Sequence, residues 1–437
     1  MKGKWIVSGI LIVALIAVCG LSVFAIWQGV QMAQSSGVHF RVGSINTVEA
    51  KDTEEKTLSV SGPAELKVEN DFGFITVQQG EDGKVVIKAD KTGWGSSDDD
   101  AKQALKDLKV VIEQDGDKIW VHLQRPAEID MIHIGPSRSA QANFTVTVPV
   151  ETNVDLKSDN GELTLTGIQG TATLKASFGD VKVKNLAGGL SVTASNGGIS
   201  VENVDTLDAP VDLSSDFGDI TVQSISARDV TIKSTNGTLN LNNIDSSGKL
   251  DVRTDFGGIE IRDGNARSLD AHSSNGKVLV QEMDVSGLVN VTSDFGDLTL
   301  EEVLSNGMDL KTQNGHVTVS GAQGKITAHS NYGNVDISAE DALVTLTSNN
   351  GKVSFDGSLA DGEHTLQSDF GDITLTIPAD IALNLDLKTG TGKIKSDLPL
   401  TISGEIDEKH WTGTINGGGA QLKVTTQNGN IIIQTSK

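Results

Sequence analysis

The sequence predicts an all-β protein, a parallel and right-handed β-helix or solenoid with rungs of about 19 residues, preceded by one N-terminal transmembrane helix. Three observations predict this fold. An Asn-Gly or Phe-Gly dipeptide recurs at near-constant spacing, apolar residues alternate around each copy, and a long uncharged segment lies at the N-terminus. Alternation with period two is typical of strands that bury one face, and a fixed repeat of this length is typical of stacked rungs.

The composition excludes several classes of protein. The 437 residues include 35 Lys and Arg against 58 Asp and Glu, for a net charge of −23, and only 4% are aromatic. Such a surface repels a phosphate backbone, so we expect no nucleic-acid partner. The chain has one cysteine, Cys19, and therefore forms no intramolecular disulfide and no cysteine-based zinc site.

The N-terminal segment is long enough to cross a membrane. Lys2 and Lys4 precede an uncharged run from Trp5 to Trp27, and 23 residues of helix reach about 34 Å. Lysines ahead of the run place the N-terminus in the cytoplasm. We therefore expect residues 1–27 to be a cytoplasmic tip and a transmembrane signal-anchor. The protein would then be a single-pass protein of the cell membrane, with the bulk of the chain extracytoplasmic.

Two other interpretations of this segment stay open. Val23-Phe24-Ala25 loosely resembles a signal-peptidase site, although the apolar run is longer than that of most signal peptides. Ile16-Ala17-Val18-Cys19 resembles the acylation site of a lipoprotein. Both alternatives also export the rest of the chain. Residues 28–55 are then expected to form a stalk or linker.

Residues 56–150 predict a β-rich N-terminal region with a short helix. Asn70–Val77 is a rung-like copy of the repeat ahead of the main array, and residues 78–150 interrupt it. Three aspartates at 98–100, followed by spaced apolar residues to Leu108, indicate an acidic helix start and an amphipathic helix. We expect strands at Val110–Glu113, Lys118–Gln124 and Phe144–Val150, and an exposed loop at Glu128–Ala142.

Residues 151–437 predict the solenoid with its C-terminal cap. Twelve turn glycines follow one another at intervals of 18 to 21 residues, and apolar residues occupy positions +2 and +4 after every one of them. A second alternating pair lies at −7 and −5, and a third apolar residue often lies at +7. Because every copy repeats the same classes at the same offsets, equivalent strands are expected to stack in parallel. The glycines are Gly161, Gly179, Gly197, Gly218, Gly237, Gly257, Gly276, Gly296, Gly315, Gly333, Gly351 and Gly371.

The residue before the glycine alternates between asparagine and an aromatic residue, so the true repeat is a pair of rungs. Position −3 is Ser or Thr in ten of the twelve copies, with Ala176 and Ala194 as the exceptions. Counting by twos from −7 and −5 predicts that −3 and −1 both point inward. The aromatic ring would then fill the volume that asparagine leaves, and the asparagine amide would bond the turn backbone.

The motifs that could carry chemistry have simpler structural explanations. Asp-Phe-Gly occurs five times, ending at glycines 73, 218, 257, 296 and 371, but no other kinase motif accompanies it. Acid pairs such as Asp216/Asp219, Asp294/Asp297 and Asp369/Asp372, with Asp180 alone, could hold Ca²⁺. A solvated acidic stripe along the rod is the preferred interpretation of these acids.

No side chain stands out as catalytic, cofactor-binding or metal-binding. The eight histidines are scattered singly, which argues against a zinc site, and the acids recur with the repeat instead of forming one catalytic pair. We therefore expect a protein that is not an enzyme and needs no cofactor. The histidines are His39, His122, His133, His272, His316, His329, His364 and His410.

The repeat, the export segment and the ending Asn428–Ile433 together resemble a bacterial family of proposed adhesins, β-strand-repeat proteins of the cell envelope with a domain of unknown function. The resemblance covers roughly residues 57–437. It implies a β-helical surface protein with an adhesive or scaffold role, and partners such as a surface glycan or an envelope or matrix protein. A carbohydrate-active enzyme, resembling the β-helical polysaccharide lyases and hydrolases, is the alternative.

Overall fold

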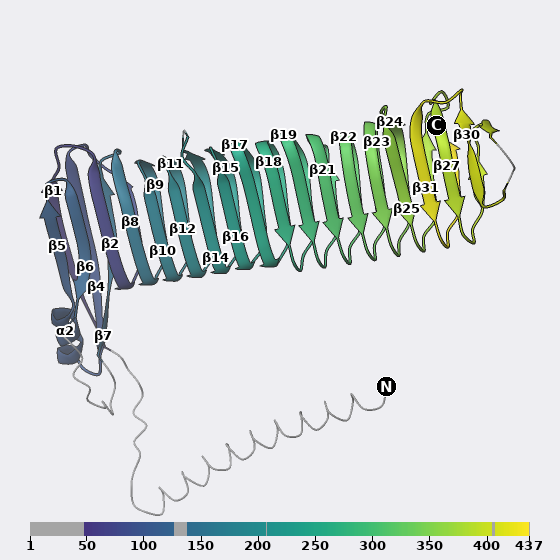
Figure 1. Cartoon of the computed structure of the whole chain (residues 1–437). Helices are drawn as coiled ribbons and strands as arrows, with labels where there is room; N and C mark the ends of the chain where they lie inside the picture. Colours follow the sequence, from purple (N-terminus) through teal and green to yellow (C-terminus); the bar gives the residue numbers. More distant parts are fainter. Residues whose placement is uncertain (1–47, 126–137, 207, 404–406, 437) are drawn as a thin grey trace, which may run out of the picture.

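The computed structural model describes residues 48–125, 138–206, 208–403 and 407–436, and these form one long rod of stacked strands (Figure 1). The rungs pair in parallel from Val154 to Ile377, as the sequence predicts, with short register shifts in some rungs, as between Ala266 and Leu269. No helix in the described part of the chain is both long and apolar enough to span a membrane. The predicted segment Trp5–Trp27 lies outside the described residues.

Two ladders of parallel strands build the rod. Ladder A contains the strands before the turn glycines, and ladder B contains the strands after them. Five long strands run from ladder B of one rung into ladder A of the next: β17 (Leu239–Phe256), β18 (Ile259–Ser273), β19 (Val278–Ser293), β22 (Val317–Ser330) and β23 (Val335–Ser348).

The shorter strands belong to one ladder each. Ladder A includes β2 (Ala64–Phe72), β8 (Thr152–Asn160), β10 (Ala172–Phe178), β12 (Leu190–Asn196), β14 (Val211–Phe217), β16 (Val230–Asn236), β21 (Leu304–Thr312) and β25 (Glu363–Ser368). Ladder B includes β3 (Ile75–Gln79), β9 (Leu163–Gln169), β11 (Val181–Ala187), β13 (Ile199–Asp205), β15 (Ile220–Ala227), β20 (Leu298–Glu301), β24 (Val353–Leu359) and β26 (Ile373–Ile377).

The core is a continuous apolar column between the two ladders. Every predicted apolar residue at +2 and +4 is buried, as are the residues at −7 and −5. The third apolar position at +7 also points inward, although its odd spacing breaks the alternation. The residue before it, at +6, adopts a left-handed conformation in most rungs, with φ of 53° at Asn185 and 74° at Gly167. This residue turns the chain and restores the inward direction one position later.

The turn glycines stack directly on one another. A Cβ atom built on Gly333 would lie 1.8 Å from the carbonyl oxygen of Gly315, and the other glycines of the column are equally crowded. Glycine is therefore required mainly because the backbones of adjacent rungs approach so closely. In rod order the column is Gly73, Gly161, Gly179, Gly197, Gly218, Gly237, Gly257, Gly276, Gly296, Gly315, Gly333, Gly351, Gly371, Gly429 and Gly392.

The solenoid begins at β2, before the predicted interruption. β2 pairs with β8 and β3 pairs with β9, so the rung-like copy at residues 70–77 is a true first rung. The chain between them forms the N-terminal cap. β7 (Ser139–Val148), β4 (Lys84–Gly95) and β1 (Val48–Ser59) extend ladder B, while β6 (Lys118–Gln124) and β5 (Lys109–Asp115) extend ladder A.

Two predictions for this region need correction. β1 begins at Val48, so the last residues of the predicted stalk are a paired strand. β7 begins at Ser139, and Ala140 and Ala142 are buried within it, so the predicted exposed loop does not extend to Ala142. The predicted helix is confirmed as α2 (Asp98–Asp107), with Ser97 as its N-cap.

The C-terminal cap is an inserted rung. β31 (Ala420–Thr426) lies between β25 and β27 (Leu383–Thr389), and β32 (Ile431–Thr435) lies between β26 and β28 (Ile394–Ser396). β30 (His410–Ile415) and β29 (Leu400–Ile402) then close the end with antiparallel pairing. The last strands in sequence are therefore not the last in space (Figure 1), which explains why the period loosens after Gly371.

Candidate functional site

The inner side of the glycine corner is polar and fully bonded in most rungs. The Ser or Thr at −3 is buried, and its hydroxyl donates to the turn-glycine carbonyl of the preceding rung, as in Ser215 to Gly197 at 3.1 Å. In the later rungs the same hydroxyl also accepts the N–H of its own glycine, as at Ser368 with Gly371 at 2.8 Å. This column occupies the interior of the corner and leaves no room for a ring.

The residue at −1 therefore points outward, and the prediction that it fills the corner is wrong. The stacked glycines turn the backbone just after position −3, and strand alternation ends there. Phe217 is 59% exposed and Phe295 is 62% exposed. We call the exposed rings at this position the aromatic row: Phe72, Phe178, Phe217, Phe256, Phe295, Tyr332 and Phe370.

The asparagines that alternate with the rings bond the turn backbone, as predicted. Each has the same register position as a ring, as in Phe178 opposite Asn196 and Asn196 opposite Phe217. Asn196 donates from Nδ2 to the carbonyl oxygen of Ser177 at 3.3 Å, and Asn350 donates likewise to Asn331 at 3.1 Å. The asparagine amide thus satisfies the turn backbone of the preceding rung.

The acidic stripe consists of two columns with different roles. The acids at +1 accept backbone N–H groups from the next rung: Asp219 from Thr238 at 2.7 Å and Asp297 from His316 at 2.8 Å. In the two rungs after Asp297, His316 and Asn334 take the same role. Asp219 and Asp297 are exposed, in agreement with the predicted solvated stripe, and each also bonds the backbone of the next rung.

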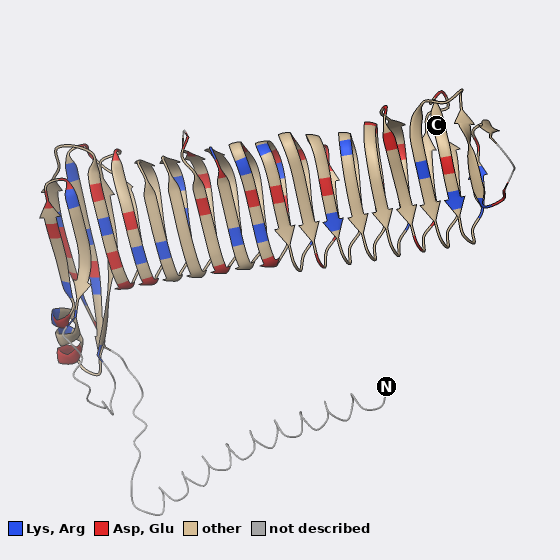
Figure 2. Ribbon diagram, viewed as in Figure 1, with Lys and Arg blue, Asp and Glu red and all other residues tan. Residues whose placement is uncertain are grey.

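The acids at −2 flank the aromatic row. Asp216 and Asp255 are exposed, and Asp294 and Asp369 are partly exposed. Figure 2 shows acidic residues at the lower edge of the rod, where ladder A ends and the glycine turns lie. Each of these carboxylates directly precedes an exposed ring, so negative charge lies beside aromatic surface in the same rungs along one edge.

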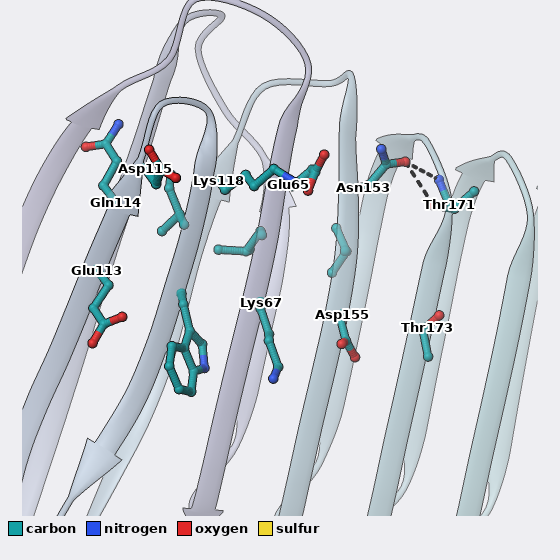
Figure 3. A pocket seen from close by; sticks show the side chains of 14 residues that line it. Glu65, Lys67, Glu113, Gln114, Asp115, Lys118, Asn153, Asp155, Thr171 and Thr173 are labelled. Carbon is teal, nitrogen blue, oxygen red and sulfur yellow. Dashed lines mark hydrogen bonds and ion pairs between the residues drawn. The ribbon is translucent and has the colours of Figure 1, made fainter.

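The aromatic row is the first candidate binding surface. The second is an open pocket of about 670 Å³ on the N-terminal cap, which we call the Trp120 pocket (Figure 3). It lies on ladder A over β5, β6, β2, β8 and β10, and its lining includes Trp120, Glu113 and Asp155. Unlike the aromatic row, it is built from residues that do not repeat. The Lys67 ammonium lies 5.1 Å from the centre of the Trp120 ring, which is cation–π geometry.

Lysine side chains pair with two of the acids near Trp120, Glu65 and Glu69. Lys118 contacts Glu65 at 2.8 Å, and that hydrogen bond raises the pKa of Lys118. Burial raises the pKa of Glu69, but hydrogen bonds from Lys67 and Trp120 outweigh it and lower the pKa overall. A general acid for glycoside cleavage needs the opposite shift.

No catalytic, cofactor or metal residue was predicted. Within the described ranges, no three His, Cys, Asp or Glu side chains lie close enough together to hold a metal ion. His39, His133 and Cys19 lie outside those ranges. His364 is fully buried: its Nδ1 accepts the Val344 N–H at 3.3 Å and its Nε2 lies 2.9 Å from the Ala360 carbonyl oxygen. Burial lowers the pKa of His364.

The sequence interpretation missed two features of the surface. The outward direction of the aromatic row was missed because alternation was extended through the turn, whereas the run of stacked glycines signals that alternation stops. The Trp120 pocket was missed because its residues come from five strands of the cap and one end of the array. The sequence pattern contains no signal for that assembly.

Comparison with known proteins connects this geometry to a family. The family model described as Toastrack DUF4097 matches residues 64–287 and 265–434. No curated protein matches the chain.

Three solved structures resemble the chain. A proposed cell adhesion protein of Clostridium sporogenes is 11% identical over 88% of this chain and 100% of its own, with a TM-score of 0.17. A proposed lipid-binding protein of Parabacteroides distasonis is 12% identical over 63% and 96%, with a TM-score of 0.29. A proposed adhesin of Bacteroides fragilis is 12% identical over 89% and 98%, with a TM-score of 0.18.

Proposed function

Because the chain belongs to the Toastrack DUF4097 family, we propose that it is a non-catalytic binding protein of the cell envelope, an adhesin or scaffold whose β-solenoid projects from the membrane. The observation that carries this proposal is the register of the outer side chains. Equivalent positions lie opposite one another rung after rung. A repetitive partner could therefore make many weak contacts that add by multivalency.

The proposed location rests on the N-terminal segment. An anchor at Trp5–Trp27 with lysines ahead of it would leave residues after 40 outside the cytoplasm. Protease added to intact cells or spheroplasts is expected to digest or release the exported part. Full protection, in cells shown to admit the protease, contradicts the proposed topology.

The binding role can be tested by removing rungs in pairs. Deletion of residues 238–276 joins Gly237 to Lys277, and deletion of 297–333 joins Gly296 to Asn334, so both keep the alternation of ring and asparagine. On a glycan and matrix-protein array, distributed recognition predicts a gradual decline in binding wherever a pair is removed. Activity on a polysaccharide that one deletion abolishes, and the other leaves intact, contradicts a non-catalytic role.

The Trp120 pocket is the feature that favours the alternative, a carbohydrate-active enzyme. It combines an aromatic ring with non-repeating acids, including Glu113 and Asp155. Against this role, burial of Glu69 is outweighed by hydrogen bonds from Lys67 and Trp120 that lower its pKa, so this acid cannot donate a proton to a leaving group near neutral pH. Assay of the full chain for release of reducing ends or unsaturated sugars from polysaccharides tests this alternative.

A further inference from the structure

The aromatic row is the most regular exposed apolar feature of the described chain. Its seven rings are between 52% exposed at Phe72 and 67% exposed at Tyr332. Successive rings are two rungs apart along one edge of the rod, a separation of ~9.6 Å. At that distance the rings cannot stack on one another.

The fold does not need these rings. Asparagine occupies the same register position in every intervening rung, with Phe217 between Asn196 and Asn236, and the backbone pairing is unchanged. Exposed apolar surface that recurs along one edge, without a structural role, marks an interaction site. The two-rung repeat therefore maintains a surface feature and not a packing feature.

The charge beside the rings restricts the partner. Asp216, Asp255 and Asp294 each directly precede a ring, and the chain as a whole has a net charge of −23. Anionic polymers and anionic lipid surfaces are repelled by this edge. A cationic group is attracted by the carboxylates, and a ring face attracts it further by the cation–π effect.

We propose that the aromatic row binds an extended polysaccharide whose sugars carry free amino groups. The apolar face of a pyranose ring stacks on an aromatic side chain, and its hydroxyl and ammonium groups reach the neighbouring carboxylates. In an extended β-1,4-linked polysaccharide alternate sugars present the same face, and this two-sugar repeat is close to the ~9.6 Å between successive aromatic rings, so every second sugar meets an aromatic ring. This inference rests on the proposed binding function and names its partner and its surface.

The chain supplies its own conservative replacement for the test. In the variant Phe217→Asn, Phe256→Asn, Phe295→Asn, three rings become the residue that alternate rungs already carry, so its thermal melt is expected to match that of the unaltered chain. A matched control removes exposed apolar side chains outside the row, Leu288→Asn and Leu304→Asn, which are 67% and 48% exposed. Both variants are made in the full chain, in detergent micelles.

Calorimetric titration with the hexamer of β-1,4-linked glucosamine measures the affinity, because six sugars span three rings. We expect binding that weakens with salt, falls at least ~10-fold in the row variant and is unchanged in the control. The fully N-acetylated hexamer, which lacks the charge, is expected to bind more weakly.

Five results would overturn the inference. Three concern soluble ligands: equal affinity of the row variant and the unaltered chain for the hexamer, equal or tighter binding of the N-acetylated hexamer, and hexalysine binding with the same dependence on the rings. The other two are row-dependent binding to phosphatidylethanolamine–phosphatidylglycerol vesicles and row-dependent self-association in sedimentation, each without hexamer binding. If binding to a partner found on the glycan and matrix-protein array declines when rung pairs are deleted but is complete in the row variant, the proposed function stands and this inference alone fails.

Discussion

The buried hydroxyl of Ser348 donates a hydrogen bond of 2.8 Å to the carbonyl oxygen of Gly333, the turn glycine of the preceding rung. The same hydroxyl accepts the N–H of Gly351, its own turn glycine, also at 2.8 Å. One side chain thus connects the turns of two rungs inside the corner. The same pair of bonds recurs at Ser330 and Ser368 in the later rungs. It explains why position −3 is Ser or Thr although it lies in an apolar core.

Replacement of this hydroxyl should destabilise the rod. Ser348→Ala removes both hydrogen bonds and leaves a carbonyl and an N–H buried without partners, so we expect a loss of about 1–3 kcal/mol in the free energy of unfolding. Denaturant titration measures it. Thr221→Ala, on the exposed face of ladder B, is the control and should change stability by less than ~0.5 kcal/mol. Equal effects of the two changes would show that the buried hydroxyl at position −3 does not stabilise the rod.

A methyl group in the glycine column should be more harmful. Gly333→Ala places a Cβ 1.8 Å from the Gly315 oxygen, which forces the rungs apart, whereas Gly189→Ala meets its nearest neighbour only at 3.4 Å. We expect Gly333→Ala to lower the melting temperature strongly and Gly189→Ala to change it little. Unaltered melting of Gly333→Ala would contradict the close stacking of the turns.

A charge between the ladders should prevent folding. Val222 is 1% exposed, and Val222→Asp buries an unpaired carboxylate at a predicted cost of more than ~3 kcal/mol. Thr221→Asp puts the same side chain on the outer face one residue earlier and should be nearly neutral. Circular dichroism and proteolysis of both variants compare the two faces of one strand.

Acidification should weaken the C-terminal part of the rod through His364. Burial lowers the pKa of His364 below its usual value of 6.5, so below about pH 6.5 the unfolded chain takes up the proton first. Stability from this group is therefore complete above pH 6.5 and is lost as the pH falls toward the folded-state pKa, by at most ~1.4 kcal/mol per pH unit. His364→Leu should flatten this dependence in denaturant titrations at pH 7 and pH 5. The same slope in both proteins would exclude His364 as its source.

Residue spacing alone predicted most of the rod. The alternation at +2 and +4 placed pairs such as Val222 and Ile220 inward because strand geometry has a fixed period. The same rule failed at Phe217, where glycine stacking ends the alternation. Local spacing also does not predict that β31 and β32 insert between earlier strands. That order depends on which strand edges are still unpaired at the end of the solenoid.

The most direct test of the account is a set of distances along the aromatic row. With Cys19 replaced by serine, spin labels on Phe178→Cys paired with Phe295→Cys, Tyr332→Cys or Phe370→Cys are six, eight and ten rungs apart in the glycine column. Pulsed electron paramagnetic resonance should give distances near ~29, ~38 and ~48 Å, an increase of ~9.6 Å for each added pair of rungs. Distances that fail to grow by equal steps would contradict a continuous solenoid whose rings form one row.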